Sequence, residues 1–213
     1  MRLFILGATG GIGLELVAQA LERGHQVTVF VRTPQKLGRL QESVTVIRGD
    51  VLNPEPLGVA LAEHDAVLSA IGPPGLGRST ITSAAAQATV TAMKAMGTHR
   101  LLIVGVGMLF DDSGLLGRFL RSTFLRNIAN DSAEMERIVR ATSLDWTIVR
   151  PPRLTNGPRT ERYGIADDHL PRGAGGALTI SRADVAHFLL DEVEGSGHLQ
   201  RVVGIAYTSR EKQ

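Results

Sequence analysis

The sequence predicts an α/β fold in which a doubly wound, mostly parallel sheet carries helices on both faces. Three observations support this class: short apolar runs alternate with amphipathic segments along the chain, several runs are apolar at consecutive positions, and the first run leads directly into a glycine-rich turn. Consecutive apolar residues suit strands that are buried on both faces of a parallel sheet. Strands that alternate with helices imply right-handed crossovers between neighbouring strands.

The expected elements fit within one domain. The strands are rich in Val, Ile and Leu, and we place them at residues 2–7, 26–31, 44–48, 66–71, 100–106, 146–150 and 202–207. The helices are expected at residues 12–23, 79–96, 132–142 and 181–193. A chain of 213 residues has the length of a single α/β domain, so residues 1–213 are assigned to one unit.

The first and third of these helices carry clear signals. In the first, Gly24 is a stop signal, and the inward stripe is expected to consist of Leu14, Val17, Ala18 and Leu21. In the third, Asp131 and Glu134 have the spacing of a capping box. The helix is therefore expected to begin just after Asp131.

Composition and charge exclude several classes of protein. The hydrophobic fraction of 43% and the charged fraction of 21% are typical of a chain with a packed core. The net charge of +2 is too small to imply a nucleic-acid partner, and no apolar stretch approaches the roughly 20 residues of a membrane span. The absence of cysteine excludes disulfides, thiolate metal sites and cysteine nucleophiles. We expect a cytoplasmic protein without nucleic-acid or membrane partners, present as a monomer or a small homo-oligomer.

The strongest functional motif is Gly7-Ala8-Thr9-Gly10-Gly11-Ile12-Gly13, which lies between the first strand and the first helix. In such a turn Gly7 permits the reversal of the chain, Gly10 lets the backbone approach a pyrophosphate, and Gly13 allows the helix to pack closely on the strand. The helix N-terminus then offers free N–H groups and a partial positive charge to the phosphates. The sequence therefore predicts a Rossmann-type dinucleotide site that includes Gly7, Thr9, Gly10, Gly11, Ile12 and Gly13.

The end of the second strand indicates which dinucleotide binds. An NAD(H) site usually has an acidic residue there, which binds the ribose 2′-hydroxyl. This chain has Arg32 and Thr33 instead, with Lys36 one helical turn further on. A guanidinium can bind a 2′-phosphate through two hydrogen bonds, whereas a carboxylate would repel it. NADP(H) is therefore expected in preference to NAD(H); the alternative is that Arg32 is a solvated surface residue.

Four further strand ends are expected to border the cofactor, since the carboxyl ends of parallel strands face the ligand. Asp50 and Val51 are placed beside the adenine, and a role of Asp50 as a helix or turn cap is an equal alternative. The remaining candidates follow the fourth, fifth and sixth strands and are Ala70, Ile71, Gly72, Val104, Gly105 and Pro151.

Two loops are expected to hold the second substrate, because they follow strands whose carboxyl ends face the cofactor. They cover about residues 107–131 and 151–177. In the first loop, Met108 and Phe110 are candidates for an apolar wall against a planar acceptor. In the second, the candidates for binding a phosphate or carboxylate are Arg153 and Arg159, with solvated loop arginines as the alternative.

These motifs resemble the atypical short-chain dehydrogenase/reductase superfamily, and within it the NAD(P)H-binding proteins related to flavin reductase and biliverdin-IXβ reductase. The similarity extends over nearly the whole chain. Besides the glycine turn, it is carried by Val31-Arg32, Gly49-Asp50-Val51, Asp65-Ala66-Val67, Ala92-Met93-Lys94-Ala95-Met96-Gly97, the stretch from Leu144-Asp145-Trp146 to Arg150-Pro151-Pro152, and Ile180-Ser181-Arg182-Ala183-Asp184-Val185-Ala186. The resemblance implies hydride transfer from NADPH to a flavin, a tetrapyrrole or a quinone-like acceptor.

The chain departs from the superfamily at the residues that usually move a proton. Neither Tyr163 nor Tyr207 has a lysine four residues later, so the Tyr-x-x-x-Lys pair is absent. Gly105-Val106-Gly107 stands where the biliverdin-reductase-like relatives have a hydroxyl residue, and Arg153 stands where they have a histidine. We therefore name no catalytic residue. The six histidines are scattered without the spacing of a metal site, so no metal is expected.

Two functions follow from these observations. The first is an NADPH-dependent reductase, in which the protein binds and orients the dinucleotide that supplies the hydride. The second is a non-catalytic NADP(H)-binding redox sensor similar to the nitrogen-metabolite-repressor type, which the missing proton donors favour. The missing tyrosine and the short late loops argue against a third class, a sugar-nucleotide epimerase or dehydratase.

Overall fold

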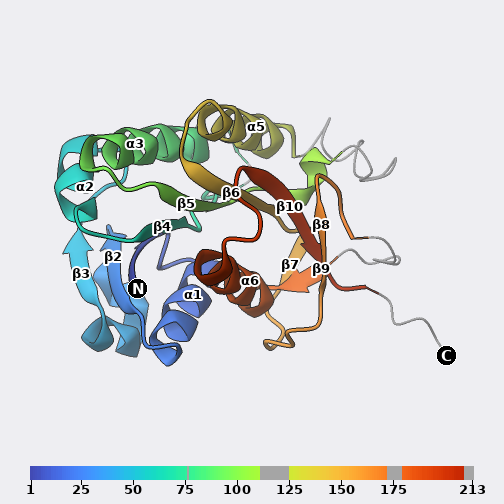
Figure 1. The fold of residues 1–213 in the computed structure, drawn as a ribbon, viewed down its shortest axis with the longest axis horizontal. Helices are drawn as coiled ribbons and strands as arrows, with labels where there is room; N and C mark the ends of the chain where they lie inside the picture. The colour runs from blue at the N-terminus through green and yellow to red at the C-terminus, as the bar shows by residue number, and fades with distance from the viewer. Residues whose placement is uncertain (76, 111–124, 172–178, 209–213) are drawn as a thin grey trace.

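An eight-stranded sheet runs through the centre of the computed structural model, which describes residues 1–75, 77–110, 125–171 and 179–208. The strand order is β3-β2-β1-β4-β5-β6-β10-β8 (Figure 1). The strands are β1 (Arg2–Leu6), β2 (Gln26–Val31), β3 (Thr45–Arg48), β4 (Ala66–Ser69), β5 (Arg100–Val104), β6 (Asp145–Arg150), β8 (Gly164–Asp167) and β10 (Arg201–Ala206). Among these described strands, β8 pairs antiparallel with β10 and the other neighbours are parallel. The predicted doubly wound, mostly parallel α/β class is confirmed.

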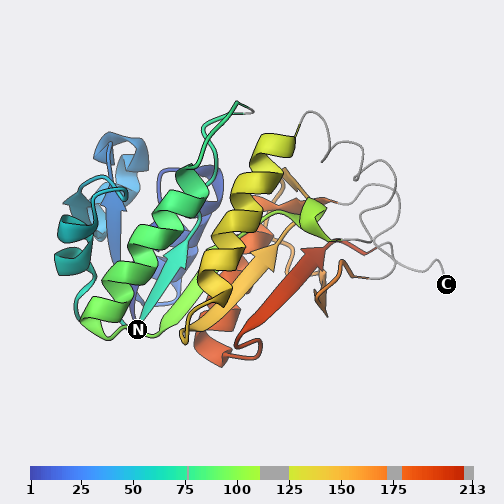
Figure 2. The ribbon, with the colours of Figure 1, turned by 90° about the horizontal axis from the view of Figure 1, so that it is seen from above.

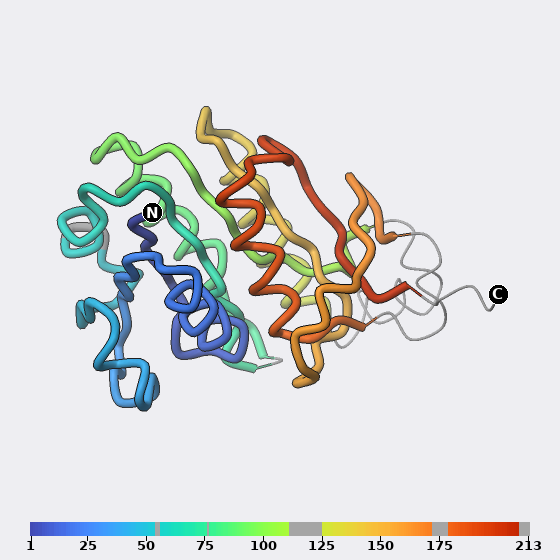
Figure 3. The backbone as a smooth tube through the Cα atoms, turned by 60° about the horizontal axis from the view of Figure 1, so that its bottom comes forward, coloured from blue at the N-terminus to red at the C-terminus, as the bar shows by residue number. Residues whose placement is uncertain are grey.

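The helices form two layers, one on each face of the sheet (Figure 1). One layer, in which Figure 2 shows α3 and α5 side by side, consists of α2 (Pro54–Leu61), α3 (Ile81–Met96) and α5 (Arg126–Arg140). On the opposite face, which Figure 3 brings forward, α1 (Gly11–Glu22) packs against α6 (Arg182–Gly195). The shorter elements are the 3-10 segments η1 (Pro34–Ser43) and η2 (Gly107–Leu109) and a small parallel sheet of β7 (Arg153–Thr155) and β9 (Thr179–Ser181).

Alternating side chains of the central strands fill two layers of the core. In β1, Leu3 and Ile5 pack in the cluster that includes α1 and α6, whereas Phe4 and Leu6 pack in the cluster that includes α2, α3 and α5. All four side chains are fully buried. Successive side chains of a strand point to opposite faces, so a strand with helices on both faces must be apolar at every position. This explains the continuous apolar run that leads into the glycine turn.

The predicted strands are confirmed, with shifts of one or two residues at their ends. The sequence reasoning did not assign α2, the two 3-10 segments or the short strands β7, β8 and β9. Because β7 and β8 lie within the predicted substrate loop at 151–177, this stretch is partly regular. Residues 172–177 of that loop lie outside the described residues.

The stripe that α1 buries differs from the predicted one. Leu14, Ala18 and Leu21 are only half-buried, whereas the buried apolar residues are Ile12, Leu16, Val17 and Ala20. Gly13 explains the difference, because a Cβ at this position would overlap the carbonyl oxygen of Gly7. Gly13 must therefore face the end of β1. This contact fixes the rotation of the helix, and residues one turn further on follow to the same side.

α5 begins earlier than predicted. Its first residue is Arg126, and Asp131 lies inside the helix rather than at its cap. The Asp131 carboxylate instead accepts hydrogen bonds from the N-terminal turn of α3, so the predicted capping box with Glu134 is wrong. Residues 126–131 of the predicted loop at 107–131 are therefore helical. Residues 111–124 of that loop lie outside the described part of the chain.

Candidate functional site

The predicted glycine turn joins β1 to α1 through contacts that side chains would prevent. Gly7 has a φ of +73°, and a Cβ there would lie 2.6 Å from the carbonyl carbon of Ala70. Gly10 donates its N–H to the carbonyl of Gly7 at 2.9 Å. A Cβ on Gly10 would meet that same oxygen alone, at 3.3 Å, so the other side of Gly10 is open. The turn is thus closely packed on the protein side and presents open backbone on the other.

A cleft of about 420 Å³ opens at this turn, along the carboxyl ends of β1, β2, β3 and β4. It lies where the strand order reverses, between β1 and β4, which is where ligands of doubly wound sheets bind. Its lining includes most of the residues predicted for the cofactor: Gly7, Thr9, Gly10, Arg32, Asp50, Val51, Ala70, Ile71 and Gly72. The fold therefore brings together residues from four separate strand ends.

The cleft also has lining residues that the sequence reasoning did not assign: Phe30, Gly49, Pro74, Ser79 and Ile81. The ring of Phe30 is 4% exposed and lies against Gly49, where a Cβ would overlap the ring. The last three residues belong to the segment from β4 to the first residue of α3. The run of glycine and proline that follows β4 is the signal that could have identified this segment as a turn at the site.

The predicted cations lie at one end of this site. Arg32 follows β2 directly, lines the cleft and has an exposed side chain. Thr33 and Lys36 are exposed at the start of η1 but do not line the cleft, and the Lys36 N–H donates to the Thr33 carbonyl at 3.2 Å. Neither Arg32 nor Lys36 forms an ion pair with a described residue. Both cations are therefore open to an anionic ligand.

Asp50 is a turn cap that also lines the cleft. One carboxylate oxygen accepts the N–H of Leu52 at 3.1 Å, which makes Asp50 a turn cap. The residue also lines the cleft beside Val51. The cap fixes the segment that follows β3, and this segment forms one wall of the cleft.

The predicted residues at the ends of β5 and β6 lie outside this cleft. Gly105 donates its N–H to β6 at 2.8 Å, and a Cβ on it would lie 3.1 Å from the carboxylate of Glu136. Gly107 donates to the carbonyl of Pro151 at 2.8 Å, which holds η2 against the end of β6. The predicted turn residues Gly11, Ile12 and Gly13 do not line the cleft either. A role in cofactor binding stays a prediction for all of these residues, as it does for those that line the cleft.

Phe110 is not an exposed wall for an acceptor, contrary to the prediction. Its ring is 2% exposed, and the guanidinium of Arg150 lies 4.5 Å from the ring centroid. Arg150 also forms an ion pair with the buried carboxylate of Glu136, with N–O distances of 2.8 and 2.6 Å. Met108 is half-buried, and Arg153 is exposed on β7 without an ion pair to a described residue. Of the three substrate candidates, Met108 and Arg153 are accessible.

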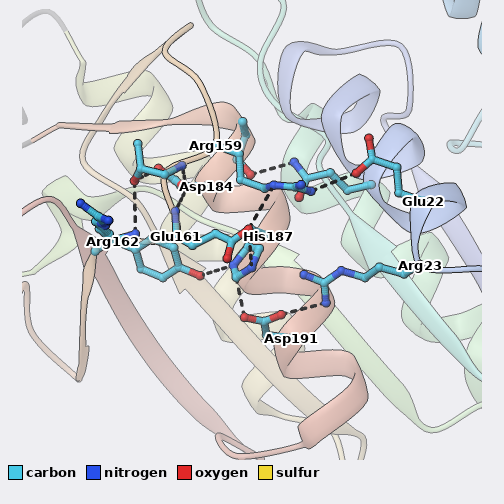
Figure 4. Close-up of polar contacts among 12 residues, drawn as sticks. Glu22, Arg23, Arg159, Glu161, Arg162, Asp184, His187 and Asp191 are labelled. Atoms are coloured by element: carbon cyan, nitrogen blue, oxygen red, sulfur yellow. Dashed lines mark hydrogen bonds and ion pairs between the residues drawn. The ribbon is translucent and has the colours of Figure 1, made fainter.

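The segment that contains Arg159, Glu161 and Arg162 lies beside residues of α1 and α6, as Figure 4 shows. Arg159 pairs with Glu22 at 3.0 Å and with Glu161 at 3.3 Å. Glu22 is the last residue of α1, so Arg159 lies at the opposite end of this helix from the glycine turn. Its predicted role in binding the cofactor or an acidic acceptor is therefore wrong.

The same segment is attached to α6 through Asp184 (Figure 4). This carboxylate is fully buried and accepts the backbone N–H groups of Thr160 and Glu161 at 2.7 and 2.9 Å. The hydroxyl of Tyr207 donates to it at 2.6 Å. Burial raises the pKa of Asp184, but the hydrogen bonds from Tyr207, Glu161 and Thr160 together lower it more, and the pKa lies below its ordinary value.

Tyr163 does not replace the missing proton donor. Its hydroxyl lies 2.8 Å from Nδ1 of His187, whose ring is also 3.2 Å from Asp191. Asp191 in turn pairs with Arg23, directly after α1, at 2.8 Å (Figure 4). Burial, and then the charges of Asp191 and Asp184, raise the pKa of Tyr163, so this phenol keeps its proton. The cluster lies toward the carboxyl end of α1, away from the glycine turn.

His64 and His198 have separate structural partners. His64 lies 2.8 Å from the hydroxyl of Thr28, and His198 lies 2.7 Å from Glu192. Within the described ranges, no group of three or more His, Asp or Glu side chains could hold a metal ion. No helix in the same ranges combines the length and the apolar character of a membrane span.

Comparisons with known proteins agree with this geometry. A family model described as NAD(P)H-binding matches residues 7–195. The chain is 30% identical over 206 residues to the uncharacterized protein YwnB of Bacillus subtilis, which covers 93% of this chain and 94% of YwnB. It is also 39% identical over 71 residues to the photosystem II assembly factor Ycf39 of Synechocystis, but this match covers 33% of the chain and 22% of Ycf39.

Solved structures share the fold over nearly the full length. A protein described as exported, from Burkholderia pseudomallei, is 28% identical with a TM-score of 0.82, covering 97% of this chain and 100% of the other. A short-chain dehydrogenase/reductase from Veillonella parvula, solved in complex with NADP, is 20% identical with a TM-score of 0.82. It covers 96% of this chain and 94% of the other. At this lower identity the likeness shows the shared fold.

Proposed function

Because the chain belongs to the NAD(P)H-binding family, whose pattern covers residues 7–195, we propose that it is an NADPH-dependent reductase acting on a flavin or another conjugated small molecule. The observation that carries the cofactor preference is Arg32, which lines the cleft at the strand end where an NAD(H) site has an acidic residue. NADPH, when bound, supplies the hydride. The residues of the chain bind it, orient it and position the acceptor.

The cleft has a suitable contact for each part of the dinucleotide. The open backbone of Gly10 and the N-terminus of α1 suit the pyrophosphate. The exposed guanidinium of Arg32 suits a 2′-phosphate, and Lys36 adds positive charge nearby. Val51 and Ile71, which are both half-buried, offer apolar contacts to the bases and ribose rings. These features support NADP(H) in preference to NAD(H).

The acceptor is proposed to lie toward the ends of β5 and β6, where Met108 and Arg153 are accessible. Arg153 has no ion-pair partner among the described residues, so it favours an acceptor with a phosphate or a carboxylate. FMN has such a phosphate. A flavin accepts hydride at N5 and can take its proton from solvent, so distance and alignment matter more for this acceptor class than a dedicated acid.

Oxidation of NADPH, followed in the presence of a panel of acceptors, tests the proposal. The panel contains FMN, lumiflavin, a quinone and a linear tetrapyrrole, with NADH as the second donor. We expect acceptor-dependent oxidation that is faster with NADPH, and we expect the Gly10→Val variant to abolish it. The reductase function is excluded if no acceptor accelerates the oxidation of either dinucleotide.

A second candidate is a non-catalytic NADP(H)-binding sensor or regulator. It is favoured by Gly105, which offers no hydroxyl. It is also favoured by Tyr163, because the hydroxyl of this residue contacts His187 of α6, in a cluster that lies near the carboxyl end of α1 and away from the glycine turn. One relative of part of this chain is named as an assembly factor rather than as an enzyme. Tight binding of NADPH without turnover of any acceptor would support this function over the reductase.

We further propose that the protein acts in the cytoplasm as a monomer or small homo-oligomer, without nucleic-acid or membrane partners. Light scattering after size-exclusion chromatography tests the oligomeric state. Because one similar structure is that of a protein described as exported, cell fractionation is the informative test of location. Recovery of the protein outside the cytoplasm would contradict this part of the proposal.

A further inference from the structure

The side chain of Arg182, a residue far from the glycine turn in sequence, lies over Gly11. A cationic group is therefore next to the turn. We infer that Arg182 is a further cofactor-binding residue, whose guanidinium binds the pyrophosphate that NADPH and NADH share. The inference rests on the NAD(P)H-binding part of the proposed function and is independent of the identity of the acceptor.

The space for Arg182 comes from the missing side chain of Gly11. A Cβ on Gly11 would lie 2.5 Å from Cδ and 2.7 Å from Nε of Arg182. Gly11 is the first residue of α1 and is not among the glycines with positive φ, so its backbone conformation does not require glycine. Glycine at this position therefore provides room, and the arginine side chain fills it.

Buried contacts fix the backbone around Arg182 in this place. Arg182 is the first residue of α6, and the N-cap Ser181 accepts the N–H of Asp184 at 2.9 Å. In α1, the side-chain amide of Gln19 donates to the carbonyl of Ala183 at 2.9 Å. The Gln19 contact ties α1 directly to the first turn of α6. The distance between Arg182 and the glycine turn is thus set by the packing of the two helices.

The guanidinium of Arg182 has hydrogen-bond donors that no described residue uses. Nη1 donates to Oδ1 of Asn156 at 2.6 Å, which holds the end of the side chain. Nε and Nη2 have no hydrogen-bond partner among the described residues, and no described carboxylate pairs with Arg182. The carboxylate of Asp184, two residues further on, is already bound by Thr160, Glu161 and Tyr207.

The electrostatics of this arrangement call for an anion. α1 has no acidic residue in its first turn, and its N-cap Gly10 makes no side-chain cap. The free N–H groups and the partial positive charge of this helix end disfavour a nearby guanidinium. Arg182 also stands at the N-terminus of α6, where a cation does not stabilise the helix. A diphosphate placed between α1 and Arg182 would accept hydrogen bonds from both.

Titration of the Arg182→Ala variant with NADPH and with NADH, followed by dinucleotide fluorescence, tests the inference. Both affinities should fall by the same factor, about 10-fold or more, because a charge-assisted hydrogen bond to a group common to both ligands is lost. Arg32→Ala is the matched control, since it should weaken NADPH alone. Arg182→Lys should keep part of the affinity, because it retains the charge without the guanidinium geometry.

A double-mutant cycle with Gly11→Ala separates pyrophosphate binding from a merely structural contact. The added methyl group must displace the flexible Arg182 side chain from the turn. The single variant should therefore lose about as much affinity as Arg182→Ala, with an unchanged thermal midpoint. In the Arg182→Ala background the same substitution should cost little, because no guanidinium is left to displace.

Three results would overturn the inference: wild-type affinity of Arg182→Ala for both dinucleotides, a loss confined to NADPH, or a Gly11→Ala loss that is equal in both backgrounds. The second would assign Arg182 to the 2′-phosphate, and the third would show that the methyl group itself blocks the ligand. The expected binding pattern without turnover of any acceptor supports the inference while excluding the reductase. A wild-type protein that binds neither dinucleotide overturns both the inference about Arg182 and the proposed NAD(P)H-binding function.

Discussion

The carboxylate of Asp131 in α5 accepts the backbone N–H of Thr82 in α3 at 3.0 Å. It also accepts the N–H of Ser83 at 3.0 Å, and the hydroxyls of both residues donate to the same carboxylate. All three residues are buried, and the N-cap residue of α3 makes no side-chain cap of its own. One helix thus caps another, which fixes the start of α3 and the segment before it that lines the cleft.

Replacing Asp131 with alanine should destabilise the protein by about 2–4 kcal/mol, because several buried donors lose their acceptor at once. Urea denaturation measures this loss. Glu134→Ala is the matched control on the same helix, because Glu134 is exposed and pairs with Arg137 one turn further on. The control should leave the midpoint nearly unchanged, and equal losses in both variants would contradict the cap between the helices.

Two glycines of the turn should respond differently to substitution. Gly13→Ala should destabilise the fold, since its Cβ would overlap the carbonyl oxygen of Gly7. Gly10→Val should remain folded but lose NADPH binding, because its side chain would occupy the open side of the turn. Circular dichroism and dinucleotide titration distinguish the two effects. A folded Gly10→Val variant that binds NADPH normally would show that the cofactor does not lie on this turn.

Arg32→Ala should weaken NADPH by about 1.5–3 kcal/mol, the scale of a hydrogen bond to a charged group, and should leave NADH unaffected. Titration of both dinucleotides measures the difference. Arg201→Ala is a suitable control, because this exposed arginine is the first residue of β10 and so lies at the amino ends of the parallel strands, whereas the cleft lies at their carboxyl ends. Equal wild-type affinities for NADPH and NADH would remove the predicted preference.

Arg153→Ala should raise the KM for FMN more than the KM for lumiflavin, because lumiflavin lacks the phosphate that the guanidinium would bind. Steady-state oxidation of NADPH with the two flavins measures this difference. The rate should show no sharp loss at the pKa of a tyrosine or a histidine, since neither residue is proposed as the proton donor. Equal changes in KM for both flavins would assign Arg153 to the cofactor or to the structure.

Acid should destabilise the fold through Asp184. Because its pKa is lower in the folded than in the unfolded chain, its stabilising contribution is complete above the ordinary carboxyl pKa of about 4. That contribution is lost as the pH falls through the lower folded value. The free energy of unfolding should therefore decline from about pH 5 downward, and less steeply in Asp184→Asn. Urea titrations across this range measure both slopes, and identical slopes would contradict the prediction.

The parts of this protein that could be predicted from sequence are those governed by local chemistry. Strand positions follow from runs of apolar residues, because strands covered by helices on both faces must be apolar throughout. The glycine turn follows from the spacing of Gly7, Gly10 and Gly13, since Gly7 and Gly13 must lack a Cβ for the chain to turn and pack, and Gly10 leaves open backbone for a ligand. The expected preference for NADP(H) rests on the same kind of local observation, because Arg32 stands in place of an acidic residue at one strand end, and this preference stays a prediction.

Only the tertiary structure decided how distant segments meet. The local sequence predicts that Asp131 caps its own helix, yet Asp131 caps α3 because α3 and α5 pack side by side. Phe110 reads as an exposed wall, yet it is covered by Arg150 from β6. From the sequence alone, nothing distinguishes Arg182 from other residues near the start of a helix. The packing of α6 on α1 places its side chain over Gly11. Periodicity and spacing describe neighbours along the chain, whereas these contacts depend on the distances between packed elements, which no local pattern encodes.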